Sequence, residues 1–250
     1  MPDRPSDADL LADLAETAAV VETSEAPPAW ERRRKATHRG PARERSNNPY
    51  LSNWARHYEF ILKVPPLQQI RTSEEKTLQR LLDASLQPTD RVLEIGPGTG
   101  RQTVKLAARV AHVTAVEQSE EMVEQLHHRL EHEGVGNCEV ITGDFTKVHF
   151  PEPFDVVALI GVVDYFADPA AFMAQVGRLA AREIVFTAPH CGCLAKGFRL
   201  CNRLRGVTVS NQSIEQVRAY LPLFEVEVIE TGLRTGLWRG MTLACRAVRR

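Results

Sequence analysis

The chain has 250 residues, of which 43% are hydrophobic and 25% charged, and its formal net charge is −1 at pH 7. These values are typical of a globular protein with a sizeable core, and they exclude a chain-wide attraction to nucleic acid or acidic lipid. The N-terminus has no signal-peptide pattern, no apolar run is long enough to span a membrane, and the cysteine count is odd at five, so we expect a cytoplasmic protein without a disulfide framework.

Residues 1–48 differ in composition from the rest of the chain. An acidic stretch with leucines near helical spacing, 7–22, precedes a basic stretch that is poor in aliphatic residues, 30–45. Such a composition is typical of a solvated or disordered extension. One alternative is an arm that contacts RNA. Another is an arm that contacts a partner, or a helix exchanged between subunits, and this alternative predicts a homodimer or a complex with a different subunit.

Two helices are expected between residues 49 and 88. The first, over 48–62, carries an aromatic face made of Tyr50, Trp54, His57 and Tyr58. From spacing alone, these rings are either ordinary core or part of a binding surface. Thr72 and Glu75 predict a capping box at the start of the second helix, which carries four leucines on one face.

From residue 92 to residue 187, short apolar runs alternate with helical patterns. Strands are expected at 92–95, 111–117, 138–142, 154–160 and 183–187, and helices at 101–110, 119–132 and 169–179. This alternation predicts an α/β fold with a parallel sheet and helices on both faces. A short helix over 213–221 and two successive strands, 224–231 and 241–248, then predict an antiparallel hairpin at one edge of the sheet.

A glycine turn joins the first of these strands to the helix that follows it. Glu94 precedes Gly96, Gly98 and Gly100, which stand at alternate positions. Glycine permits positive φ and close approach of a ligand to the backbone, and a strand, turn and helix in this order present backbone to a nucleotide-like ligand. A dinucleotide fingerprint needs its third glycine where this chain has Arg101, which disfavours a nicotinamide cofactor.

An acidic residue followed by G-x-G-x-G resembles the first motif of the class I S-adenosylmethionine-dependent methyltransferases. The two closing strands support this resemblance, because the family departs from a dinucleotide-binding sheet at the same place. The resemblance covers about residues 50–248. It implies a doubly wound, mostly parallel seven-stranded sheet, S-adenosylmethionine as the cofactor, and methyl transfer to a hydroxyl, carboxyl or activated carbon of a small molecule, as in a biosynthetic tailoring step.

The resemblance assigns cofactor contacts to residues that follow successive strands. Glu117 would accept hydrogen bonds from the ribose hydroxyls, Asp144 would bind the adenine amino group and Phe145 would cover the ring. Glu94 would bind near the turn and the methionine amino group. The other expected cofactor residues are Gly96, Pro97, Gly98, Gly100, Gln118 and Gly161. Taken as structure alone, Glu117 and Asp144 are helix caps or loop carboxylates, and Glu94 stabilises the turn.

The family often closes an N-terminal helix and a segment after the fifth strand over its substrate. The resemblance therefore implies a methyltransferase domain over 49–250, with a helical lid at about 49–88 and a substrate wall at about 190–212. The expected substrate-binding residues are Tyr50, Trp54, Tyr58 and Arg199. The candidates for a general base, or for orienting the acceptor, are His190, His57, Asp164 and Tyr165.

Three other interpretations concern a metal site, the acceptor and the presence of catalysis. His190 and the cysteines that follow it have zinc-ligand chemistry but not the usual spacing, so we expect no metal. An RNA methyltransferase is an alternative, because the dimethyladenosine rRNA enzymes have a similar Leu-Glu-Ile-Gly-Pro-Gly-Thr-Gly run, although near-neutral charge and the absence of an Asn-Leu-Pro-Tyr-like motif disfavour it. A non-catalytic partner subunit or a repurposed cyclase is the other alternative, since no residue is an unmistakable base.

Overall fold

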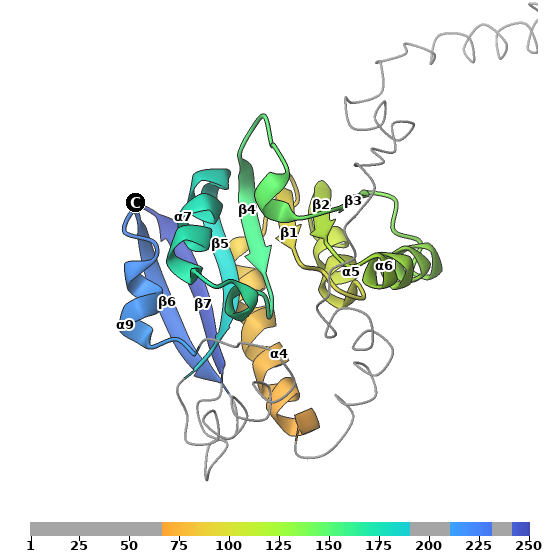
Figure 1. The fold of residues 1–250 in the computed structure, drawn as a ribbon. Helices are drawn as coiled ribbons and strands as arrows, with labels where there is room; N and C mark the ends of the chain where they lie inside the picture. Colours follow the sequence, from red (N-terminus) through yellow and green to blue (C-terminus); the bar gives the residue numbers. More distant parts are fainter. Residues whose placement is uncertain (1–66, 191–210, 232–241) are drawn as a thin grey trace, which may run out of the picture. The chain divides into compact units, whose positions relative to one another are not determined.

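The computed structural model describes residues 67–190, 211–231 and 242–250. Five predictions lie outside these ranges: the N-terminal arm, the aromatic helix over 48–62, His57 as a general base, the substrate-binding residues, and the cysteines between 191 and 201. Within the described ranges, the chain forms a central sheet flanked by helices (Figure 1).

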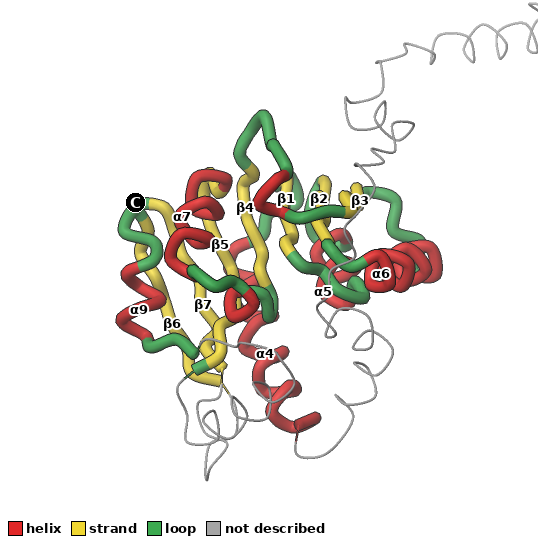
Figure 2. The backbone as a smooth tube through the Cα atoms, in the orientation of Figure 1, coloured by secondary structure: helices red, strands yellow, loops and turns green. Residues whose placement is uncertain are grey.

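The sheet has seven strands, which lie side by side in the order β3-β2-β1-β4-β5-β7-β6 (Figure 2). Their bounds are β1 (Arg91–Ile95), β2 (His112–Glu117), β3 (Cys138–Thr142), β4 (Phe154–Leu159), β5 (Ala180–Pro189), β6 (Phe224–Thr231) and β7 (Thr242–Arg249). Neighbouring strands among the first five pair in parallel, whereas β7 runs antiparallel between β5 and β6. The predicted fold class, including the closing antiparallel pair, is therefore confirmed.

Side chains cap the N-termini of several of the helices. The helices are α4 (Leu67–Ser85), α5 (Arg101–Ala107), α6 (Glu120–His132), α7 (Pro169–Leu179) and α9 (Ile214–Ala219), with 3-10 turns η1 (Phe145–Lys147) and η2 (Val163–Tyr165). The Ser119 side chain accepts a hydrogen bond from the Met122 amide at the start of α6. Ser213 and Gln216 make both bonds of the expected capping box at α9.

Alternating strand residues build a core on each face of the sheet. On one face, Val92 of β1 packs with the leucines of α4 and α5. On the other, its neighbour Leu93 packs with α7 and α9, where Phe172 and Val217 are buried. This is the two-fold periodicity that a strand covered on both sides requires.

The predicted capping box at Thr72 and Glu75 is wrong. α4 begins at Leu67, so both residues lie inside the helix, and the Glu75 carboxylate instead accepts from Gln79 and Gln102. The later part of the expected lid range therefore contains a helix packed on the sheet by Leu78, among others.

Two nearly buried ion pairs tie the end of α4 to β5 and β7. Arg182 bonds both oxygens of Asp90, at 2.9 and 2.7 Å, and donates to the Ser85 carbonyl at 2.8 Å. Arg246 bonds both oxygens of Glu183, at 2.7 and 3.1 Å, and reaches the Ser85 hydroxyl at 3.0 Å. The carboxylates are 2% and 5% exposed, so they depend on these arginines for compensation, and Arg182 also lies 3.6 Å from Glu183.

Candidate active site

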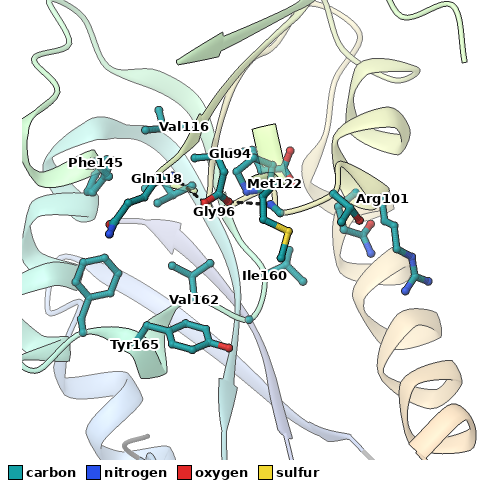
Figure 3. A pocket seen from close by; sticks show the side chains of 18 of the residues that line it. Glu94, Gly96, Arg101, Val116, Gln118, Met122, Phe145, Ile160, Val162 and Tyr165 are labelled. Atoms are coloured by element: carbon teal, nitrogen blue, oxygen red, sulfur yellow. Dashed lines mark hydrogen bonds between the residues drawn. The ribbon is translucent and has the colours of Figure 1, made fainter. Parts of the chain in front are cut away.

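A cavity of about 280 Å³ lies at the carboxyl ends of the central strands. Its walls come from the glycine turn after β1, the residues after β2 and β3, the loop after β4, and the first half of α4 (Figure 3). In an α/β sheet, ligands bind where the carboxyl ends of parallel strands meet. Most of the residues expected to bind the cofactor therefore converge on one cavity.

The glycines of the turn have different surroundings. A Cβ on Gly100 would stand 2.4 Å from Leu126 Cδ1, whereas a Cβ on Gly98 would meet no atom within 4 Å. Gly98 lines the cavity, as do Gly96 and Pro97, but Gly100 does not. The open space at Gly98 thus leaves room for a ligand to approach the backbone of the turn, while Gly100 is needed for packing against α6.

Glu117 is held in place by backbone donors at the end of β2. Its Oε2 accepts from the Gly98 amide at 3.0 Å, and its Oε1 accepts from the amides of Gln118 and Ser119 at 2.7 and 2.8 Å. The residue is 8% exposed and lines the cavity, as does the exposed Gln118. A carboxylate accepts about four hydrogen bonds and three are already made, so about one more can come from a ligand hydroxyl.

Glu94 reaches the same cavity from within β1 and is 2% exposed (Figure 3). Burial raises the pKa of its carboxyl to about 7, the Thr103 hydroxyl lowers the pKa and the charge of Glu117 raises it further. Its Oε2 has no hydrogen-bond partner within the described part of the chain. A buried acceptor oxygen without a partner suits a cationic or hydrogen-bond-donating ligand group.

Asp144 and Phe145 follow β3 and line the cavity together. Asp144 Oδ1 accepts from the Thr146 amide at 3.0 Å and its hydroxyl at 2.7 Å, so the carboxylate caps η1. Partial burial raises the pKa of Asp144, but the bonds from Thr146 and the charge of Lys147 outweigh it and lower the pKa. The Phe145 ring is buried and packs edge-on against Phe172, at 5.7 Å between centroids.

The loop after β4 brings one of the candidate acceptor-handling residues to the cavity. Tyr165 lines it, beside Gly161, whose amide donates to the Thr187 hydroxyl at 2.8 Å. Asp164 is half-buried, and burial raises the pKa of its carboxyl to about 6, but it does not line the cavity. His190 forms a bridge with Gln212 at the end of β5 and is also absent from the lining.

Sequence reasoning missed the wall formed by α4 and the start of α5. Glu74 and Glu75 line the cavity from α4, and Arg101 and Gln102 line it from α5. Gln102 Nε2 donates to Glu75 Oε2 at 2.8 Å, which joins the two helices. The position of Arg101 and Gln102 directly after the glycine turn is a signal that could have been used, whereas nothing local links Glu75 to a residue 27 positions later.

The charges of the cavity fit the cofactor that the glycine motif implies. The lining residues include five carboxyl groups, those of Glu74, Glu75, Glu94, Glu117 and Asp144, and one guanidinium, that of Arg101. S-adenosylmethionine carries an ammonium, a sulfonium and a carboxylate, and thus a net positive charge. The excess of carboxyl groups suits this positive charge, the unpartnered oxygen of Glu94 suits the ammonium, and Glu117 suits a ribose hydroxyl.

Comparison with known proteins bears on the same segment. Residues 92–183 match a family model described as a methyltransferase domain. The chain is 38% identical over 122 residues to a protein-L-isoaspartate O-methyltransferase of Koribacter versatilis, covering 47% of this chain and 54% of that one. It is 49% identical over 74 residues to a probable ribosomal RNA small subunit methyltransferase A of Methanosarcina barkeri, covering 30% and 25%. The chain thus spans about half or less of the length of these relatives.

Solved structures share the fold over more of the chain. The magnesium protoporphyrin IX methyltransferase of Synechocystis, crystallised with S-adenosylhomocysteine, superposes with a TM-score of 0.65 at 20% identity, over 80% of this chain and 96% of that one. The N-methyltransferase NodS of Bradyrhizobium japonicum superposes with a TM-score of 0.58 at 18% identity, over 76% and 91%. Residues 92–183 are therefore similar to a methyltransferase domain, and the described chain shares the fold of these two solved methyltransferases.

Proposed function

We propose that the protein transfers a methyl group from S-adenosylmethionine to a small-molecule acceptor. The observation that carries the proposal is the Glu117 carboxylate, which three backbone amides hold beside the open space at Gly98. A fixed carboxylate next to an exposed glycine backbone is what an adenosine ribose needs for close binding. The two solved structures support the same interpretation, because both hold S-adenosylhomocysteine and one is a magnesium protoporphyrin IX methyltransferase.

In this proposal the side chains of the cavity bind the cofactor and orient the acceptor. The cofactor itself, when bound, supplies the reactive methyl group on its sulfonium. Glu117 would accept a hydrogen bond from the ribose, and the unpartnered oxygen of Glu94 would accept one from the ammonium. Phe145 and Asp144 would contact the adenine. The loop after β4 would hold the acceptor beside the cofactor. Asp164, Tyr165, His190 and His57 stay our candidates for orienting or deprotonating the acceptor.

RNA methylation is a second candidate, favoured by the relatives that are named ribosomal RNA methyltransferases. The charge of the chain speaks against it. Its formal net charge is −1, whereas a protein that binds a phosphate backbone places an excess of lysine and arginine against it. We therefore propose a small molecule rather than RNA as the acceptor.

The proposal is tested with S-adenosylmethionine labelled in its methyl group, incubated with the protein and a cell extract. The extract is then separated into small-molecule, RNA and protein fractions. We expect label in the small-molecule fraction, and at least about tenfold less with Glu117→Ala, because loss of a charged acceptor costs on the order of 1.5–3 kcal/mol. Glu152→Ala is the matched control, since this carboxylate is exposed on the surface and pairs with Arg91 outside the cavity.

Label in the RNA fraction alone would replace the proposal by the RNA alternative, and label in the protein fraction alone by protein methylation. No label in any fraction, with the cofactor bound normally, would favour the non-catalytic subunit or the cyclase.

A further inference from the structure

Tyr165 stands out among the residues that line the cavity because its side chain is 51% exposed. The other large hydrophobic side chain exposed to this degree in the described ranges is Leu223, which lies outside the cavity. Figure 3 shows the Tyr165 ring at the rim, close to Val162. An aromatic ring held at the rim of a concave site is a common binding surface, because it offers a large flat contact at a low entropic cost.

The segment that carries Tyr165 is anchored on both sides. The Tyr165 amide donates to the Val162 carbonyl at 3.1 Å, and Val163 between them is fully buried. The next residue, Phe166, stacks on Phe172 of α7, at 3.6 Å between centroids and 9° between planes. The backbone is therefore fixed immediately before and after the ring, so the fold itself holds Tyr165 out at the rim.

The wall beside Tyr165 is apolar. The loop after β4 contributes three further side chains to the cavity wall, those of Ile160, Val162 and Phe166. None of them carries a polar atom. The carboxyl groups of the cavity come from other elements: α4, the ends of β1 and β2, and the turn after β3. A ligand on the Tyr165 side thus meets aromatic and aliphatic surface, and the nearby carboxylates disfavour an anionic group.

We propose that Tyr165 is a specificity-determining residue that stacks on a flat, uncharged aromatic ring of the methyl acceptor. This inference rests on the proposed methyl transfer, because it takes the loop after β4 as the acceptor side of the cavity. It names the class of acceptor as an aromatic ring that bears the group to be methylated and lacks phosphate. Stacking between rings adds to the energy of apolar burial, so a saturated ring of the same size binds less tightly.

The test uses the full chain saturated with S-adenosylhomocysteine and three matched probes: 2-naphthol, its saturated analogue decahydro-2-naphthol, and 2-naphthyl phosphate. Dissociation constants are measured for the wild type, Tyr165→Phe, Tyr165→Ala and the control Leu223→Ala. We expect 2-naphthol to bind most tightly. Its affinity should fall about tenfold in Tyr165→Ala and stay within about twofold in Tyr165→Phe and Leu223→Ala.

Three results would overturn the inference while methyl transfer stands: 2-naphthol binds no better than its saturated analogue, the phosphate binds as well, or Tyr165→Ala leaves the affinity unchanged. Failure of the proposed function has a different signature. In that case S-adenosylhomocysteine itself does not bind the wild-type protein, and the inference falls with the function on which it rests. A fall in 2-naphthol affinity with unchanged affinity for S-adenosylhomocysteine separates an acceptor role from general damage to the fold.

Discussion

Gly98 and Gly100 stand two residues apart, and both have positive φ, at 57° and 82°. They differ in what surrounds them, because Gly98 faces open space in the cavity and Gly100 faces Leu126. The same substitution at the two positions therefore separates ligand approach from packing. The backbone strain of a left-handed alanine, about 1–2 kcal/mol, is common to both.

We predict that Gly98→Ala mainly weakens cofactor binding and Gly100→Ala mainly weakens the fold. In Gly98→Ala, the dissociation constant for S-adenosylhomocysteine should rise at least about tenfold, while the free energy of unfolding falls only by the strain of about 1–2 kcal/mol. In Gly100→Ala, the contact with Leu126 adds an overpacking cost of about 1–3 kcal/mol. Titration calorimetry and urea unfolding measure the two quantities. Equal effects of both substitutions on affinity would contradict the assignment.

Glu94 makes the stability of the protein depend on pH. Burial raises the pKa of this carboxyl from 4.5 to about 7, so the folded state keeps its proton at a pH where the unfolded state loses it. Below 4.5 both states hold the proton and Glu94 has no effect on stability. Between 4.5 and 7 the free energy of unfolding falls as the pH rises, and above 7 the full cost remains, on the order of 3 kcal/mol.

We therefore predict that Glu94→Gln stabilises the ligand-free protein more at pH 8 than at pH 5. The free energies of unfolding of the variant and the wild type should diverge by on the order of 2 kcal/mol over this range. Urea denaturation at both pH values measures the difference, with the exposed Glu152→Gln as the control that should show no such divergence. A difference that stays constant with pH would show that Glu94 is ionised in the fold at pH 5.

At the scale of elements, α4 depends on the arginines of β5 and β7. Arg246 compensates Glu183, which is 5% exposed, and also bonds the end of the helix. We predict that Arg246→Ala lowers the free energy of unfolding by on the order of 3 kcal/mol, because it removes both short bonds to a buried carboxylate and leaves it only the 3.6 Å contact with Arg182. The exposed pair of Arg91 and Glu152 provides the control, where Glu152→Ala should cost under about 1 kcal/mol.

A double variant sharpens this test. Replacing Glu183 by Gln in the Arg246→Ala background removes the buried charge that Arg246 no longer compensates and should restore part of the lost stability. No recovery would mean that the contacts of Arg246 with Ser85 and Ala84, rather than the ion pair, dominate its effect.

The strands and helices from residue 91 onward were predictable because their signals are local. The strand predicted at 224–231 matches β6, and the helix predicted at 169–179 matches α7. The start of α4 was not predictable from Thr72 and Glu75, because a Thr-x-x-Glu pattern also occurs inside helices and here Glu75 bonds residues of α5 instead. The expected helix over 101–110 ends earlier, at Ala107.

For the site, the residues that follow strands were predictable and the walls between elements were not. Gly98, Glu117 and Phe145 line the cavity as expected, because parallel strands bring their carboxyl ends together. His190 also follows a strand, but at the end of β5 it pairs with Gln212 outside the cavity. Strand order alone does not say how far around the edge of the sheet a cavity extends, which is why the position of His190 had to come from the structure.

At the scale of the whole molecule, the described chain is one sheet with a core on each face and a cavity at its edge. The cores fix the sheet, the sheet fixes the strand ends, and the strand ends place the carboxylates of Glu94 and Glu117 around the glycine turn. In the part of the chain that the structure describes, no helix is long and apolar enough to cross a membrane. We propose that the cavity at this edge of the sheet binds S-adenosylmethionine.

Calorimetric titration of the full chain tests this claim most directly. S-adenosylmethionine, S-adenosylhomocysteine and NAD are titrated separately into the wild type and into Glu117→Ala. We predict binding of the two sulfur compounds to the wild type, no binding of NAD, and an affinity at least about tenfold lower in the variant, from the loss of a charge-assisted hydrogen bond. Binding of NAD instead, or equal affinities in wild type and variant, would contradict the assignment of this cavity.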